Sequence, residues 1–397
     1  MRRRTVTILT LTLFVFASDS ACNRSRTPTS PSAPDTPAVP VTQPAPPFSL
    51  DAPAAPSKEY NGQDLSTFSG AALRAGASEL AEAEEFAAAI QVEHWAVAAE
   101  PTDGVYNLAC YYARAGLIDA GFYWLQKAAL DEGVDADYLL EDRDMIPLRS
   151  DPRWGRIEAF MRACNDYWPK SGHHREVVVT PRGYRPGAPI PVLVGLHGYG
   201  AMPEDFGGES EYQELADELN IAVVGISGTL ARGPSQFVWS EDIDRDMKHV
   251  LAGLAHVKDR VTPQPGAVVV IGFSQGGQLA GEFFARAPAS YAGAIMLCPG
   301  MLGDAHLQEV TKSPLLADRS VIIVSGKKES LGNRLMAMDA AKWFQTARAR
   351  VTVKVFPEMG HSFPPDYFQH LRTWLGQILR RPKDLEGHSP SQAEMES

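Results

Sequence analysis

Residues 268–277 read Val-Val-Val-Ile-Gly-Phe-Ser-Gln-Gly-Gly, and this stretch decides the fold of the chain. The β-branched run 268–271 predicts a buried strand, and the residues from Gln275 onward predict a helix. Between them lies a Gly-x-Ser-x-Gly turn with Ser274 at its tip. In such a turn the Ser takes a strained backbone angle, and the flanking glycines let strand and helix approach closely. Ser274 is therefore the candidate nucleophile, and the alternative is a Gly-rich turn with a solvated Ser.

The sequence around this turn alternates strands and helices from Arg175 onward. The predicted strands cover residues 176–180, 191–196, 221–226, 267–271, 292–297, 321–324 and 351–356. The predicted helices cover residues 212–219, 241–259, 333–349 and 367–379. An unbroken alternation implies an α/β fold with a doubly wound, mostly parallel sheet. Ligands are then expected at the carboxyl ends of the strands.

A Ser hydroxyl needs a base, and in enzymes with this turn the base comes last in the chain. His361 lies in Met-Gly-His-Ser-Phe directly after the strand 351–356, where the glycine allows a tight turn. His361 is the predicted base. The alternatives are His306 in a loop, His370 within a helix and His388 near the chain end.

The acid that orients this base should lie between Ser274 and His361, after a strand. Glu329 stands three residues past Gly326, at the carboxyl end of the strand 321–324, and is the predicted acid. Asp304, which follows the preceding strand, is the main alternative. Asp318 precedes its strand and Asp339 lies inside a helix, so both are less suitable.

Two backbone N–H groups are expected to bind the oxyanion. One belongs to Gln275, directly after the nucleophile. The other is assigned to Tyr199, in the His-Gly-Tyr-Gly loop after the strand 191–196. The alternative for this loop is an ordinary Gly-rich turn.

Four motifs together resemble the phospholipase/carboxylesterase branch of the α/β-hydrolases. They are Leu196–Gly200, Gly272–Gly277, Gly326-x-x-Glu329 and Gly360-His361, and the resemblance covers roughly residues 175 to 380. It implies a serine esterase that needs no cofactor and no metal. The chain departs from the family pattern in two places. Glu329 stands where the family usually has Asp, and Tyr199 replaces a residue that is often aliphatic.

Residues 60–170 are predicted to form a small helical domain, ahead of a hydrolase domain at 175–381. One helix is expected over Glu79–Ala99 and two more over 106–116 and 120–130. The last two, with a Gly-containing turn and small residues between them, resemble a tetratricopeptide unit closed by 148–154. A second unit is a candidate between Leu65 and Ala99. So few units do not make a stable array. We expect a cap or a docking surface for a protein partner, and the alternative is a packing module without a ligand.

The first 22 residues resemble a signal peptide. Arg2–Arg4 give a positive start, and the apolar stretch 5–17 is too short to span a bilayer comfortably. Ser20-Ala21-Cys22 resembles a bacterial lipoprotein signal, which makes Cys22 the candidate lipidation residue. Asp19 departs from that signal, so a plain secretory cut stays open. A Pro-rich linker over 23–59 and a polar tail over 382–397 complete the predicted organisation.

These features predict an exported serine carboxylesterase, lipid-anchored in a bacterial cell envelope or secreted. A net charge of −11 argues against a nucleic-acid partner. The other three cysteines are expected to be small buried residues. The alternatives within enzymes are a peptidase or a polysaccharide-ester hydrolase of the feruloyl type. The alternative of another class is a catalytically inert scaffold that binds a partner through the helical unit.

Overall fold

The computed structural model describes residues 41–379 except 102, 241 and 301–304. The predicted signal peptide, the lipidation of Cys22, the first part of the linker and the polar tail all lie outside these residues. Within the described residues, no helix is both long enough and apolar enough to cross a membrane.

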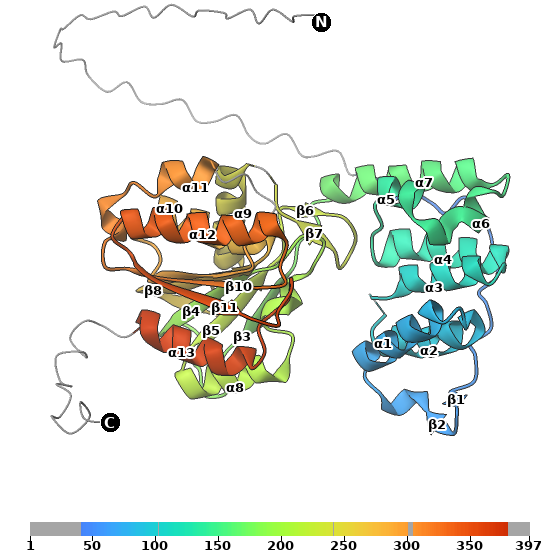
Figure 1. Cartoon of the computed structure of the whole chain (residues 1–397), viewed down its shortest axis with the longest axis horizontal. Coiled ribbons are helices and arrows are strands. Elements are labelled where there is room, and N and C mark those ends of the chain that lie inside the picture. Colours follow the sequence, from blue (N-terminus) through green and yellow to red (C-terminus); the bar gives the residue numbers. More distant parts are fainter. Residues whose placement is uncertain (1–40, 102, 241, 301–304, 380–397) are drawn as a thin grey trace, which may run out of the picture. The chain divides into compact units, whose positions relative to one another are not determined.

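A seven-stranded sheet forms the centre of the region from Glu176 onward (Figure 1). Its spatial order is β11-β10-β9-β8-β4-β5-β3. The strands are β3 (Glu176–Val179), β4 (Pro189–Leu196), β5 (Ala222–Ile226), β8 (Thr262–Phe273), β9 (Gly293–Leu297), β10 (Ser320–Gly326) and β11 (Arg350–Phe356). All neighbours pair in parallel except β3, which pairs antiparallel with β5 at one edge. The predicted α/β fold with a mostly parallel sheet is confirmed.

Helices cover both faces of this sheet because alternate strand residues point to opposite sides. In β4, Val192 and Val194 join the core on one face, while Leu193 joins the core on the other. The first face is covered by α9 (Ile243–His256), α10 (Gln275–Arg286), α11 (Ala305–Val310) and α12 (Leu331–Thr346). The second face is covered by α8 (Ser210–Leu219) and α13 (Tyr367–Leu379). A parallel sheet buried on both faces explains the near-continuous apolar runs of its strands.

The strand register brings the loops after several strands to the same edge of the sheet. Leu196 of β4 pairs with Gly272 of β8, and Gly326 of β10 pairs with Phe356 of β11. The loops that carry residues 197–200, 274, 329 and 361 therefore all leave the sheet at the carboxyl ends of its strands.

The region before the sheet is helical. Its helices are α1 (Gly70–Glu82), α2 (Phe86–Ala99), α3 (Val105–Arg114), α4 (Ile118–Asp131), α5 (Ala136–Glu141), α6 (Ile146–Arg149) and α7 (Trp154–Tyr167). The prediction of one helix over Glu79–Ala99 is wrong. The chain turns at Glu84, whose φ of 61° lies in the left-handed region, and this ends α1 before α2 begins. The region thus holds two successive helix pairs, and its likeness to tetratricopeptide units stays a prediction.

The described end of the predicted linker packs on this helical region. Residues 41–58 contain no helix or strand. The Phe48 ring nevertheless lies 5.6 Å from the Phe122 ring, and the Phe48 N–H donates to Gln126 Oε1 at 2.9 Å. An aromatic side chain in a Pro-rich segment can bury surface that its neighbours cannot, so this part of the segment is docked.

Several features of the structure were not predicted. One is a two-stranded antiparallel ribbon of β1 (Glu59–Tyr60) and β2 (Gln63–Asp64), and others are the short helices α5 and α6. Between β5 and α9, the strands β6 (Leu230–Ala231) and β7 (Phe237–Val238) pair as a two-stranded antiparallel ribbon. Helix α11 and the antiparallel direction of β3 also went unforeseen. The ribbon strands have two residues each, which is too short for a periodic pattern.

Candidate active site

Ser274 lies in the tight turn between β8 and α10. Its backbone angles are φ 54° and ψ −117°, a strained conformation for a residue with a side chain. The Ser274 N–H donates to Leu297 O at 2.9 Å, and the Ser274 carbonyl accepts the Gly300 N–H at 3.2 Å. The turn is thus fixed to the end of β9 and to the loop that follows it, and the Ser274 side chain is largely buried.

The glycines around Ser274 are required by close backbone packing. A Cβ on Gly272 would lie 2.0 Å from Gly276 O, and a Cβ on Gly276 would lie 2.1 Å from Leu196 O. A Cβ on Gly277 would lie 2.6 Å from Leu297 O. The strand, the helix and the loop after β4 approach one another so closely that only glycine fits at these positions.

Replacing Gly276 by Ala is therefore expected to destabilise the fold by at least about 3 kcal/mol, because backbone atoms must move to admit the methyl group. The matched control is Gly332→Ala on α12, where a Cβ would meet nothing within 4 Å. The control should be neutral or stabilising by up to about 1 kcal/mol. Urea denaturation of both variants measures the difference. Equal stability of the two variants would contradict the packing account.

His361 is placed beside Ser274 by the loop after β11. Its Nε2 lies 2.9 Å from Ser274 Oγ, and its ring lies 4.8 Å from the Phe273 ring. Cys298 also holds this loop in place, because its thiol donates to Ser362 O at 3.6 Å. Burial raises the pKa of the Cys298 thiol to about 12, so it remains protonated as a donor. The structure thus brings His361 and Ser274 within hydrogen-bond distance of each other.

Glu329 lies on the far side of the His361 ring. Its Oε2 is 2.6 Å from His361 Nδ1, and its Oε1 accepts the Ser330 N–H at 2.8 Å and an Asn333 Nδ2–H at 3.2 Å. Burial would raise the pKa of this carboxyl group. The hydrogen bonds from His361 and Ser330 outweigh burial, however, and hold the pKa below its ordinary value. A carboxylate here fixes the proton on Nδ1 and leaves Nε2 free to accept from Ser274 Oγ.

The alternative residues do not join this chain of hydrogen bonds within the described part of the structure. Asp318 precedes β10 at the opposite edge of the sheet, and Asp339 lies on α12. His370 on α13 stacks on Trp374 at 5.5 Å. Asp304, the His306 side chain and His388 lie outside what the structure describes.

The loop after β4 lines the same cavity as Ser274. This cavity has a volume of about 380 Å³ and is lined by Gly198, Tyr199, Ala201, Asp205, Phe273, Ser274, His361 and Phe363. A Cβ on Gly198 would lie 3.5 Å from Ser274 Cβ, so the loop passes directly beside the nucleophile candidate. Tyr199 is 45 % exposed, with the Arg232 guanidinium 5.1 Å above its ring.

His197 supports this loop in a way that sequence reasoning missed. It is fully buried, and its Nε2 accepts the Gly228 N–H at 2.7 Å. The proton is then on Nδ1, which donates to Gly198 O at 2.6 Å. Burial lowers the pKa of His197 to about 4, which keeps the ring neutral near pH 7.

The side chain of Gln275 fixes the other wall of the site. Its amide makes two hydrogen bonds of 3.1 Å with the backbone of Trp239, and Trp239 Nε1–H donates to His197 O at 2.9 Å. Asn333 similarly supports Glu329. The position of His197 directly after β4 is visible in the sequence, but its hydrogen-bond partners are not, because they include backbone groups far away in the chain.

Comparison with known protein families assigns the region that contains this site. A family model described as "Putative esterase" matches residues 169–383, which is more than half of the chain. The chain belongs to this esterase family, and the prediction of an esterase-type hydrolase is confirmed.

Individual relatives carry similar descriptions. "Putative esterase NocK" of Nocardia uniformis subsp. tsuyamanensis is 31% identical over 133 residues, which cover 30% of this chain and 39% of that protein. Among solved structures, a Bacillus cereus carboxylesterase is 18% identical with a TM-score of 0.39, covering 54% of this chain and 99% of its own. The esterase PE8 is 17% identical with a TM-score of 0.43, and the match covers 52% of this chain and 99% of the PE8 chain.

Proposed function

We propose that this protein is an exported serine carboxylesterase whose catalytic residues are Ser274, His361 and Glu329. The observation that carries the proposal is the continuous chain of hydrogen bonds, 2.9 Å from Ser274 Oγ to His361 Nε2 and 2.6 Å from Nδ1 to Glu329. Acyl transfer through a Ser requires a nucleophile that is hydrogen-bonded to a base, and a base that is oriented by an acid.

The reaction follows from these positions. His361 Nε2 takes the proton of Ser274 Oγ as that oxygen attacks the ester carbonyl carbon. Glu329 stabilises the imidazolium, which then gives the proton to the departing alcohol. Water, activated by the same His361, releases the acid from the acyl-enzyme and restores Ser274.

The developing oxyanion would be bound by the N–H groups of Gln275 and Tyr199. Gln275 begins α10, so its N–H lies at the positive end of the helix dipole. Tyr199 stands in the loop that passes beside Ser274. The His197 and Trp239 hydrogen bonds support this assignment because they hold both donor segments in place before the substrate binds.

A panel of substrates tests the proposal. It contains esters of graded acyl length and an anilide with the same acyl group as one of the esters. A cavity of about 380 Å³ lies at the small end of ligand sites, so kcat/KM should be highest for short acyl chains. A matched anilide should not be turned over. Preferred cleavage of the anilide would favour the peptidase alternative. Absence of turnover by the folded protein on every ester would favour the inert scaffold.

Asp205 places a titratable carboxyl group in the wall of the cavity. It lies in the turn Pro203–Phe206, and its pKa is raised to about 7 by burial and then by the charges of Glu204 and Glu209. The carboxyl group is neutral below this pKa and negative above it. Ester hydrolysis should therefore discriminate increasingly against anionic acyl groups as the pH rises.

We expect kcat/KM for a monosuccinyl ester, relative to its neutral methyl-succinyl counterpart, to fall about tenfold from about pH 6 to 8. Asp205→Asn should abolish this fall because the amide does not ionise. The measurement is the ratio of the two substrates in both proteins across this pH range. The same fall in the variant would show that another charge is responsible.

Export with a lipid anchor at Cys22 remains part of the proposal. It is supported by the positive start, the apolar stretch and the Ser-Ala-Cys sequence. Incorporation of an alkyne-bearing fatty acid in a bacterial host should be lost in Cys22→Ser. Equal incorporation in that variant would contradict anchoring at Cys22. The helical region is proposed as a docking surface for a protein partner.

A further inference from the structure

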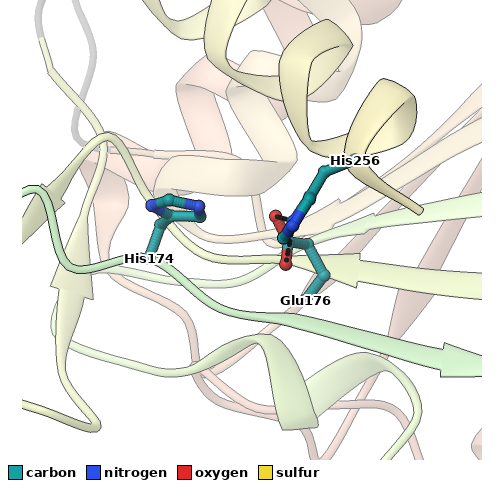
Figure 2. A group of neighbouring side chains, drawn as sticks. All are labelled: His174, Glu176 and His256. Carbon is teal, nitrogen blue, oxygen red and sulfur yellow. Dashed lines mark hydrogen bonds and ion pairs between the residues drawn. The ribbon is translucent and has the colours of Figure 1, made fainter.

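Three metal-ligating side chains gather away from the candidate active site, where β3 meets the end of α9. His174 precedes β3, Glu176 is the first residue of β3, and His256 is the last residue of α9 (Figure 2). Each offers one ligand atom, and these atoms all lie within 4.8 Å of one another. None of the three residues lines the cavity that contains Ser274.

The hydrogen bond of the His174 imidazole leaves a nitrogen lone pair available for a cation, and the His256 imidazole already faces a carboxylate. His174 Nδ1 lies 2.9 Å from Gly172 O, so the proton is on Nδ1 and Nε2 is unprotonated in the neutral ring. A His that donates one ring N–H to a backbone carbonyl and offers the other nitrogen is typical of metal ligands. His256 Nδ1 lies 3.2 Å from both carboxylate oxygens of Glu176, and Figure 2 shows the two groups facing each other.

We propose that His174, Glu176 and His256 bind a divalent transition-metal ion, with Zn²⁺ as the best fit. Two imidazoles and one carboxylate suit Zn²⁺, whereas Mg²⁺ and Ca²⁺ prefer oxygen ligands. Tetrahedral zinc with ligand bonds of about 2.1 Å places its ligand atoms about 3.4 Å apart. His256 Nδ1 and the Glu176 oxygens are already 3.2 Å apart, and zinc would replace the proton that Nδ1 donates in this bond. The His174 side chain is exposed, and its rotation would close the remaining gap.

The location gives the metal a structural role. β3 is the edge strand of the sheet and pairs only with β5 among the described strands. The Ser227 N–H donates to the carbonyl of the adjacent Arg175 at 3.0 Å, and the Arg175 N–H donates to Ser227 Oγ at 3.0 Å. The Ser227 carbonyl in turn accepts from His249 Nε2 of α9 at 2.9 Å. An ion that joins β3 to the last turn of α9 would fasten this edge strand to the helix that covers it. Water would complete the three-residue ligand set.

The test is a calorimetric titration of the tag-free full chain, stripped with a chelator, with ZnCl₂ and separately with MgCl₂. One zinc ion per chain is expected at this site, with no comparable binding of magnesium. Zinc in excess should also raise the Tm, because it binds the folded state. His256→Gln, His174→Gln and Glu176→Gln should each weaken zinc binding by at least about tenfold.

The matched control is Lys258→Gln, which changes an exposed residue two positions after His256 and should leave zinc affinity unchanged. A second group, Cys298, Glu329 and His361, could also take zinc, and Cys298→Ala leaves that group with only two ligands. In the Cys298→Ala background, a folded protein that binds no zinc would overturn the proposal. Zinc affinity that survives all three Gln substitutions would overturn it as well. Esterase activity takes no part in this readout, so the proposal stands or falls independently of the proposed function.

Discussion

Ser274→Ala is expected to lower kcat for ester hydrolysis by about 10⁶-fold, to the level that binding and the oxyanion donors alone provide. The change removes the hydroxyl that bonds His361 Nε2 at 2.9 Å and leaves no atom to form the acyl-enzyme. Ala keeps the Cβ, so the turn at φ 54° is no more strained than before. Initial rates on a short-chain p-nitrophenyl ester, with burst analysis, measure the loss.

The control for this variant is Ser362→Ala, an exposed hydroxyl next to His361. The Cys298 thiol contacts the backbone carbonyls of Gly360 and Ser362 and not the Ser362 hydroxyl, so this variant should retain activity. If Ser274→Ala kept kcat within about tenfold of the wild type while folded, another nucleophile would have to do the chemistry.

Glu329→Gln is expected to lower kcat by about 10³- to 10⁴-fold with little change in KM. The Gln amide can donate to His361 Nδ1, which favours the tautomer with its proton on Nε2. That tautomer cannot accept the proton of Ser274. The neutral amide also withdraws the charge that stabilises the imidazolium.

Two further variants sharpen this measurement. Glu329→Asp keeps the charge on a shorter arm and should recover a large part of the kcat lost in Glu329→Gln. Glu358→Gln removes an exposed carboxylate that pairs with Lys328 in the same region and should behave as wild type. A wild-type kcat in Glu329→Gln would contradict the role of Glu329 as the acid that orients His361. Asp304 would then become the candidate for that role.

The residues of the candidate site could be predicted because each stands just after a strand with a clear apolar run. Ser274, Glu329 and His361 follow β8, β10 and β11, and parallel strands bring their carboxyl ends to one edge. The glycines in these loops mark where the backbones nearly touch. These local signals needed no knowledge of long-range contacts.

The supporting network could not be predicted because its contacts join side chains to distant backbone groups. Neither the bonds from Gln275 to Trp239 nor the bond from Gly228 to His197 leaves a pattern in the sequence. The break at Glu84 was missed because the Ala- and Glu-rich stretch has high helix propensity on both sides of the turn. The zinc proposal depends in the same way on β3 and α9 meeting in space.

The most direct test of the central claim is fluorophosphonate labelling of the purified full chain, followed by mass-spectrometric mapping of the adduct. A single adduct on Ser274, absent from Ser274→Ala and present in Ser362→Ala, is the predicted result. A folded wild-type protein that is not labelled, or an adduct on another residue, would contradict Ser274 as the nucleophile of this esterase.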